Sequence, residues 1–180
     1  MKSVLISIQP KWCELITLGK KTVEVRKTKP KLLTPFKCYI YCTKGFKPNT
    51  AYLYKTWAGC GKVIGEFVCD EIYDGILSKS YFVDSVNIGY DKTCVSIDEI
   101  AKYLDVYGTC GMFEFYGWHI SDLVIYDKPK ELNEFVIQRK ITTLTTEHNI
   151  EGIVHYPQEK YIFEKLTRPP QSWCYVEALE

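Results

Sequence analysis

The sequence predicts one domain of the α+β class that is mainly β, with a few short helices. Several short segments rich in β-branched and aromatic residues are separated by glycine and proline turns, which is typical of strands. Only two segments show the spacing of apolar residues expected for a helix, and both are short. The 180 residues contain no internal repeat and no dividing linker, and this length is sufficient for one core.

The opening predicts a strand, a helix and a second strand. Residues 4–8 are an unbroken apolar run, which indicates a buried strand. Pro10 suits the first turn of a helix, and Gly19 is a natural stop for it. The chain then returns through residues 22–26, which we expect to be extended.

The middle of the chain predicts further strands. Residues 38–43 form a strong strand candidate, residues 52–54 a short one, and residues 62–73 one long strand with Val63, Phe67 and Cys69 in one register. Ser96 and Glu99 form a capping box, which predicts a helix that ends near Tyr103.

The last third adds strands of different kinds. Residues 113–116 and 118–126 predict two strands, the second with Trp118, Ile120, Val124 and Tyr126 on one face. Residues 137–146 are rich in threonine and predict one arm of a hairpin. Residues 173–178 predict the closing strand.

Charge is balanced over the whole chain but not along it. The formal net charge is +1, so any affinity for nucleic acid must come from a local patch. The first 62 residues provide one, because Glu14 and Glu24 are the only acidic residues among many lysines. Acidic residues gather later, from Asp70 onward.

The eight cysteines include no C-x-x-C pair. Cys38 and Cys42 are four residues apart with no histidine nearby, which argues against zinc. A catalytic cysteine acting with His119 or His155 lacks a local signature. No secretory signal is present, and no segment approaches the ~20 apolar residues of a membrane span. We expect reduced thiols, no metal, no cofactor, no membrane partner and a cytoplasmic location.

The most informative stretch lies at residues 19–26. Side chains alternate along a strand, so Val23 and Val25 should face the core while Thr22, Glu24 and Arg26 share the other face. Lys20 and Lys21 should lie at the start of this strand, where the chain has just left the helix at Gly19. A glutamate and an arginine on one face can hold each other and still offer donors to a ligand.

Four of these residues, Gly19, Lys21, Glu24 and Arg26, fit the G-x-K-x-x-E-x-R signature of ASCH domains, and the chain resembles that family. The opening residues 4–10, the mid-chain segment 65–67 and the ending 169–176 are also similar, the last to phage and bacterial versions. The resemblance implies a PUA-like β-barrel over residues 1–180 with the first helix near its mouth. Residues 139–168 look like an insertion.

The resemblance implies a cationic cleft at the barrel mouth that binds RNA or a modified nucleoside. Lysine and arginine side chains would meet phosphate or carbonyl oxygens, and an aromatic side chain, with Trp118 as one candidate, would stack a base. The expected ligand contacts are Trp12, Lys20, Lys21, Thr22, Glu24, Arg26, Tyr41 and Lys44. Ser7, Gln9, Gln171 and Ser172 are lesser candidates.

Two other classes of function stay open. Some ASCH proteins are amidohydrolases that act on acetylated cytidine, and one is a ribonuclease. The resemblance implies that Lys21 is the catalytic lysine of such a hydrolase. Glu24 occupies the position of the hydrolase's nucleophilic threonine. In this chain Glu24 would therefore have to act as a general base on water. A protein-interaction or regulatory domain is the third class. The sequence does not fix the oligomeric state.

Overall fold

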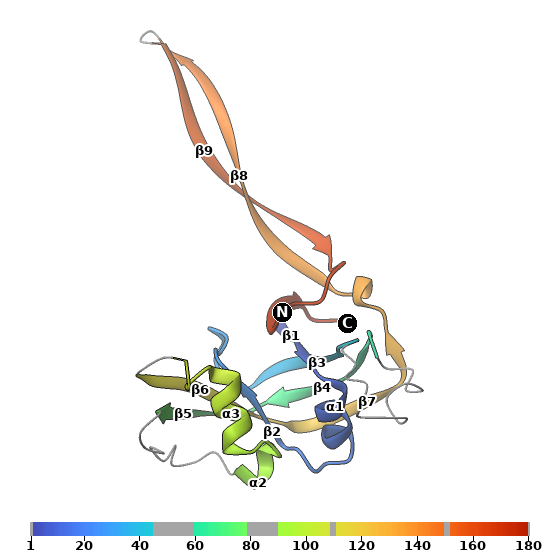
Figure 1. Cartoon of the computed structure of the whole chain (residues 1–180). Helices are drawn as coiled ribbons and strands as arrows, with labels where there is room; N and C mark the ends of the chain where they lie inside the picture. Colours follow the sequence, from blue (N-terminus) through green and yellow to red (C-terminus); the bar gives the residue numbers. More distant parts are fainter. Residues whose placement is uncertain (1, 45–59, 79–89, 109–110, 150–151, 180) are drawn as a thin grey trace.

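The computed structural model describes residues 2–44, 60–78, 90–108, 111–149 and 152–179 (Figure 1). Within these ranges the chain forms ten strands, three α-helices and one short 3-10 helix, η1 (Leu132–Glu134). The expected α+β, mainly β class is therefore confirmed.

The largest sheet has five strands in the order β10 (Trp173–Glu177), β1 (Lys2–Ile8), β3 (Phe36–Cys42), β4 (Val63–Cys69) and β7 (Ser121–Lys130). The β1 and β3 strands run parallel, and the other neighbours run antiparallel. A parallel pair needs a crossover connection, and helix α1 (Pro10–Thr17) and strand β2 (Val23–Arg26) lie within it.

A second sheet has the order β2, β6 (Met112–His119), β5 (Ile72–Ser78), and helices α2 (Tyr90–Thr93) and α3 (Ile97–Leu104) lie beside it (Figure 1). The third sheet is a ribbon of β8 (Val136–Asn149) and β9 (Gly152–Lys165). Hydrogen bonding among the described strands thus forms three separate sheets and does not close into a barrel.

The central strands of the large sheet are buried on both faces. In β1, Val4 and Ile6 pack toward the cluster that contains α1, whereas Leu5 packs toward the opposite cluster around Phe135 and Val176. Strands covered on both faces consist of continuous apolar residues, which explains the unbroken run at the start of the chain.

The two predicted helix ends have the expected local structure. Gly19 has φ +68°, and its N–H and that of Lys20 donate to the carbonyls of Ile16 and Leu15, which is a Schellman ending for α1. Ser96 and Glu99 cap α3 reciprocally.

One predicted strand was wrong. Residues 62–73 form two strands, β4 and β5, that belong to different sheets, because the chain turns at residues 70–71. The shared register of Val63 with Phe67 and Cys69 was also wrong. An irregularity in the ladder follows Val63, so that Ile64 joins Phe67 in one cluster while Val63 faces the other side.

The boundary predicted at residue 117 was also misplaced. Strand β6 continues to His119, and β7 begins at Ser121. Trp118 therefore belongs to a different strand from Val124, whose side chain is half exposed rather than part of a shared buried face. The short strand expected at residues 52–54 lies outside the described residues.

The two strands predicted in the C-terminal part of the chain, the closing strand and the threonine-rich arm, are both present. The β10 strand pairs with β1, as a closing strand should. The threonine-rich segment forms part of β8, which is longer than predicted, and the ribbon of β8 and β9 projects far from the body (Figure 1). The reading of residues 139–168 as an insertion stays a prediction. None of the described helices has the length and apolar character required to cross a membrane.

Candidate functional site

Strand β2 divides its side chains between a core and a cavity. Val23 and Val25 pack against α3 and Phe115. Glu24 and Arg26 lie on the opposite face, and both are buried, with exposed fractions of 4% and 8%. The two carry an ion pair of 3.0 Å between Arg26 Nη2 and Glu24 Oε1.

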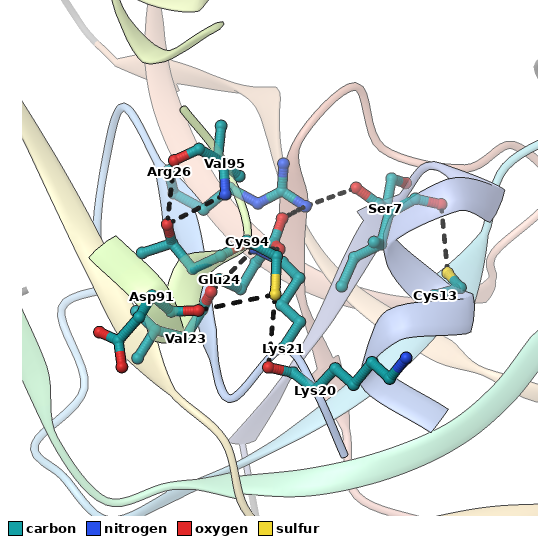
Figure 2. A network of polar contacts seen from close by, with 12 residues as sticks. Ser7, Cys13, Lys20, Lys21, Val23, Glu24, Arg26, Asp91, Cys94 and Val95 are labelled. Carbon is teal, nitrogen blue, oxygen red and sulfur yellow. Dashed lines mark hydrogen bonds and ion pairs between the residues drawn. The ribbon is translucent and has the colours of Figure 1, made fainter. Parts of the chain in front are cut away.

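Lys21 enters the same group from the turn after α1. Its side chain is 1% exposed. Its Nζ donates to the carbonyls of Val23 (2.8 Å) and Thr93 (2.6 Å) and lies 3.2 Å from Glu24 Oε2. A lysine ammonium has three donors, so these three partners satisfy it. Figure 2 shows this network of Lys21, Glu24 and Arg26.

Arg26 is only partly satisfied. Its Nη2 donates to the carbonyl of Ser7 at 2.6 Å, which ties β2 to β1 (Figure 2). Its Nε is buried and has no hydrogen-bond partner among the described residues. Two cations and one carboxylate leave the buried group with a formal charge of +1. Such a group is suited to an acceptor atom supplied by a ligand.

The group opens onto a cavity of about 430 Å³. Strand β2 forms its floor, α1 contributes Trp12, and α3 contributes Ile100 and Tyr103. The full lining is Ser7, Gln9, Trp12, Lys21, Glu24, Val25, Arg26, Thr43, Val95, Ile100, Tyr103 and Gln171. The indole ring of Trp12 lies 5.2 Å from Lys21 Nζ, which is within the range of a cation–π contact.

An ion pair links the two helices beside the cavity. Lys11 of α1 donates to Glu99 of α3 at 2.9 Å, and its ammonium also lies 4.0 Å from the Trp12 ring. The hydrogen bond from Lys11 holds the pKa of the Glu99 carboxyl below its ordinary value. On the buried face of α1, burial raises the pKa of the Cys13 thiol well above its ordinary range.

The structure places four of the eight expected ligand contacts around the cavity: Trp12, Lys21, Glu24 and Arg26. Among the lesser candidates, Ser7, Gln9 and Gln171 also line it, whereas Ser172 does not. The shared face of Glu24 and Arg26 follows from strand alternation, as expected.

Four expected contacts lie elsewhere. Lys20 is exposed, and Figure 2 shows its side chain directed away from the network. Thr22 acts through its backbone, which hydrogen-bonds to Lys92 and Ile120. Tyr41 is buried on the opposite face of the large sheet, since β3 alternates and Cys42, not Tyr41, faces α1.

Lys44 is exposed and lies against Gly61, so it is also outside the cavity lining. Trp118 is fully buried between Phe36 and Trp173 and therefore cannot act as a stacking platform.

Sequence reasoning missed the contribution of α3 and of residues 93–95. The helix itself was predicted, but nothing in its pattern indicated that Ile100 and Tyr103 would face β2. The Thr93 carbonyl that holds Lys21 carries no side-chain signal.

Comparison with known proteins bears on the fold. No protein-family model and no curated protein sequence matches the chain. A search of solved structures finds the crystal structure of ASCH from Zymomonas mobilis, with a TM-score of 0.51 and 22% identity over 73% of this chain and 75% of that one. The chain has the fold of an ASCH domain. A single-residue variant of the Zymomonas protein gives a TM-score of 0.50 and 21% identity over 74% and 78% of the two chains.

The ASCH fold agrees with the resemblance drawn from residues 19–26. The signature residues Lys21, Glu24 and Arg26 are the ones that meet at the cavity of this domain.

Proposed function

We propose that the cavity binds a nucleobase or nucleoside, either free or as an unpaired nucleotide of RNA. The observation that carries the proposal is the buried Nε–H of Arg26, which has no acceptor among the described residues although Arg26 lines the cavity. A buried donor of this kind is costly unless a water molecule or a ligand in the cavity supplies the acceptor. A base carbonyl or ring nitrogen supplies one.

The rest of the cavity supports a flat, polar ligand. Trp12 of α1 and Tyr103 of α3 contribute aromatic rings to the lining, and Gln9 and Gln171 offer both donors and acceptors. The volume of about 430 Å³ lies within the range of small-molecule sites. Under this proposal Lys21 orients Glu24 rather than contacting phosphate, because its three donors are already used.

Hydrolysis of an acylated nucleoside is the second candidate, because Lys21 and Glu24 lie side by side on the cavity wall. Both oxygens of Glu24 already form ion pairs, so accepting a proton from water would weaken these contacts. Binding without rapid turnover is therefore the preferred function.

We also propose which proteins within and beyond the ASCH domains this chain is related to. The ending at residues 169–176 supports placing it with phage and bacterial ASCH domains, and RNA as the ligand would suit a cytoplasmic location. The fit of Gly19, Lys21, Glu24 and Arg26 to the ASCH signature supports a relation to PUA-like proteins.

Calorimetry with cytidine, uridine, adenosine and an N-acetylated cytidine tests the proposal. Arg26→Lys keeps the charge but removes the Nε donor, so we expect a loss of affinity of about 10-fold or more. Trp12→Ala removes a stacking ring, with an expected loss of ~1–3 kcal/mol. Tyr41→Phe on the far face is the matched control and should bind as the wild type does.

The same titrations separate the classes of function. If no nucleoside binds, or if Arg26→Lys and Trp12→Ala bind like the wild type, the cavity is not a nucleoside site and a protein-interaction role gains support. Rapid release of acetate from the acetylated nucleoside, abolished in Glu24→Gln with binding retained, would establish the hydrolase instead.

A further inference from the structure

The ribbon of β8 and β9 is a second candidate for a binding surface. Its ladder runs without interruption from the pair Val136 and Lys165 to the pair Asn149 and Gly152. It projects from the body as an isolated arm (Figure 1). A two-stranded ribbon has no third strand or helix to cover its side chains, so both of its faces are available along most of its length.

The foot of the ribbon has two unlike faces. One face carries Ile137, which packs against the cluster of Phe135 and Leu166 and is turned to the body. Paired residues of an antiparallel ladder share a face, so the pairs on the other side form a continuous surface. This outer face carries the pairs Gln138–Phe163 and Lys140–Tyr161, with Lys165 opposite Val136 at one end and Glu159 opposite Thr142 at the other. All of them except Val136 are exposed.

Two aromatic rings dominate the outer face. Tyr161 is 54% exposed and Phe163 is 62% exposed. They lie two residues apart on one strand, so their side chains emerge roughly 6.8 Å apart. This spacing is about twice the step between stacked bases in a duplex strand, and it therefore fits successive bases of an extended single strand. Every base has a face that can stack on such rings.

The charge at the foot of the ribbon suits a polyanion. Residues 136–142 and 159–168 contain two carboxylates, Glu159 and Glu164, and five cations: Arg139, Lys140, Lys160, Lys165 and Arg168. Glu159 pairs with Lys140, and Glu164 pairs with Arg139.

Lys165 and Arg168, by contrast, form no ion pair with any residue in the described ranges. Both line a hollow of about 670 Å³ at the foot of the ribbon, together with Gln138, which pairs with Phe163 in the ladder. Cations beside exposed rings are the combination that single-stranded nucleic acids require.

We propose that the outer face of the ribbon binds single-stranded RNA. Tyr161 and Phe163 stack two successive bases, and Lys165 and Arg168 contact the phosphates beside them. The inference shares the class of ligand with the proposed function, but it concerns a different surface and stands or falls separately. The cavity would select one nucleotide, whereas the ribbon would hold the strand that carries it.

Fluorescence anisotropy with a short labelled oligouridylate tests the inference. Tyr161→Ala and Phe163→Ala should each weaken binding by at least about 5-fold, and the double variant by about 25-fold or more. Tyr156→Ala is the matched control, because this tyrosine lies on the same strand, is 47% exposed and pairs with Thr145 on the other face. It should stay within about 2-fold of the wild type, below the weakest loss expected for a stacking ring.

The charge and the independence of the two sites are tested separately. Replacing Lys165 and Arg168 by glutamine should reduce the slope of log affinity against log salt by about 1.4, since each phosphate contact on a single strand contributes ~0.7. The Tyr161/Phe163 double variant should bind free nucleoside in the cavity as the wild type does. Arg26→Lys should retain the part of the RNA affinity that depends on the rings.

Three results would overturn the inference. The first is wild-type protein that does not bind the oligonucleotide. The second is a double variant that binds it normally. The third is a wild type that elutes as a dimer while the double variant is a monomer with unchanged RNA affinity, which would assign the face to a second copy of the chain. Ultraviolet crosslinking of RNA to the wild type, mapped to the peptide that contains Tyr161 and Phe163, gives a readout that requires no variant.

Discussion

Replacing Glu24 by glutamine is the most direct test of how the buried charges are held. Glu24 is the only carboxylate in contact with Lys21 and Arg26 among the described residues, at 3.2 and 3.0 Å. Glutamine keeps the shape and one acceptor oxygen but removes the negative charge. The buried group would then carry a formal charge of +2 in place of +1.

The magnitude follows from the burial of the three side chains, which are 1%, 4% and 8% exposed. Removing one partner of a buried pair typically costs ~3–5 kcal/mol, because the remaining charge keeps its desolvation penalty. Here two cations lose the same partner, so we expect a loss in that range or above. For a chain of this length, 1 kcal/mol corresponds to about 2–4 °C in Tm, and the expected shift is therefore roughly 6–20 °C.

Urea unfolding followed by tryptophan fluorescence measures the free energy directly. Asp74→Asn is the matched control, because it also replaces a carboxylate by its amide and breaks an ion pair, with Lys29 at 2.7 Å, but on the exposed surface. That pair should contribute less than about 1 kcal/mol. The reasoning about the buried group is refuted if Glu24→Gln lowers the free energy of unfolding no more than Asp74→Asn does. The comparison requires that the dependence of this free energy on urea concentration is the same in both variants.

Three further predictions use other parts of the chain. Ser96→Ala removes the side chain that caps α3 and should destabilise the protein by ~1 kcal/mol in the same assay, whereas Ser96→Asp should retain most of the stability. Burial opposes ionisation of Glu66, but hydrogen bonds from Lys37 and Tyr126 outweigh it and hold the pKa of Glu66 below its ordinary value. The ionised Glu66 therefore stabilises the fold above about pH 4.3, and this contribution is lost as the pH falls through the folded-state pKa. The difference in unfolding free energy between wild type and Glu66→Gln should shrink on acidification, and a difference that grows would contradict this account. Finally, a thiol titration of denatured, unreduced protein should find all eight cysteines reactive, and fewer would indicate a disulfide.

Much of the candidate site could be predicted because it depends on local rules. The alternation along β2 places Glu24 and Arg26 on one face, and the turn at Gly19 delivers Lys21 to the end of the strand. These relations involve neighbours in sequence, so side-chain periodicity and turn chemistry are sufficient to find them.

The parts that failed depend on pairing between distant segments. Tyr41 was expected at the site, but which face of β3 meets α1 is decided by the parallel pairing with β1. The irregular ladder after Val63 similarly turns that side chain away from Phe67, and no residue pattern marks it. The position of α3 over β2 likewise follows from tertiary packing, which the spacing within one helix cannot specify.

The pairing of β10 with β1 has a consequence for the order in which the protein can fold. Ser7, on the wall of the cavity, receives its backbone and hydroxyl hydrogen-bond partners from Ser172 and Pro170. During synthesis the ribosome makes β1 first and β10 last among the described strands. One edge of β1 therefore stays unpaired until all the other described strands have been made. An apolar strand left with an open edge invites association between chains. Until β10 pairs with β1, that edge of β1 is unprotected, and the cavity wall at Ser7 is incomplete until residues 170–172 dock.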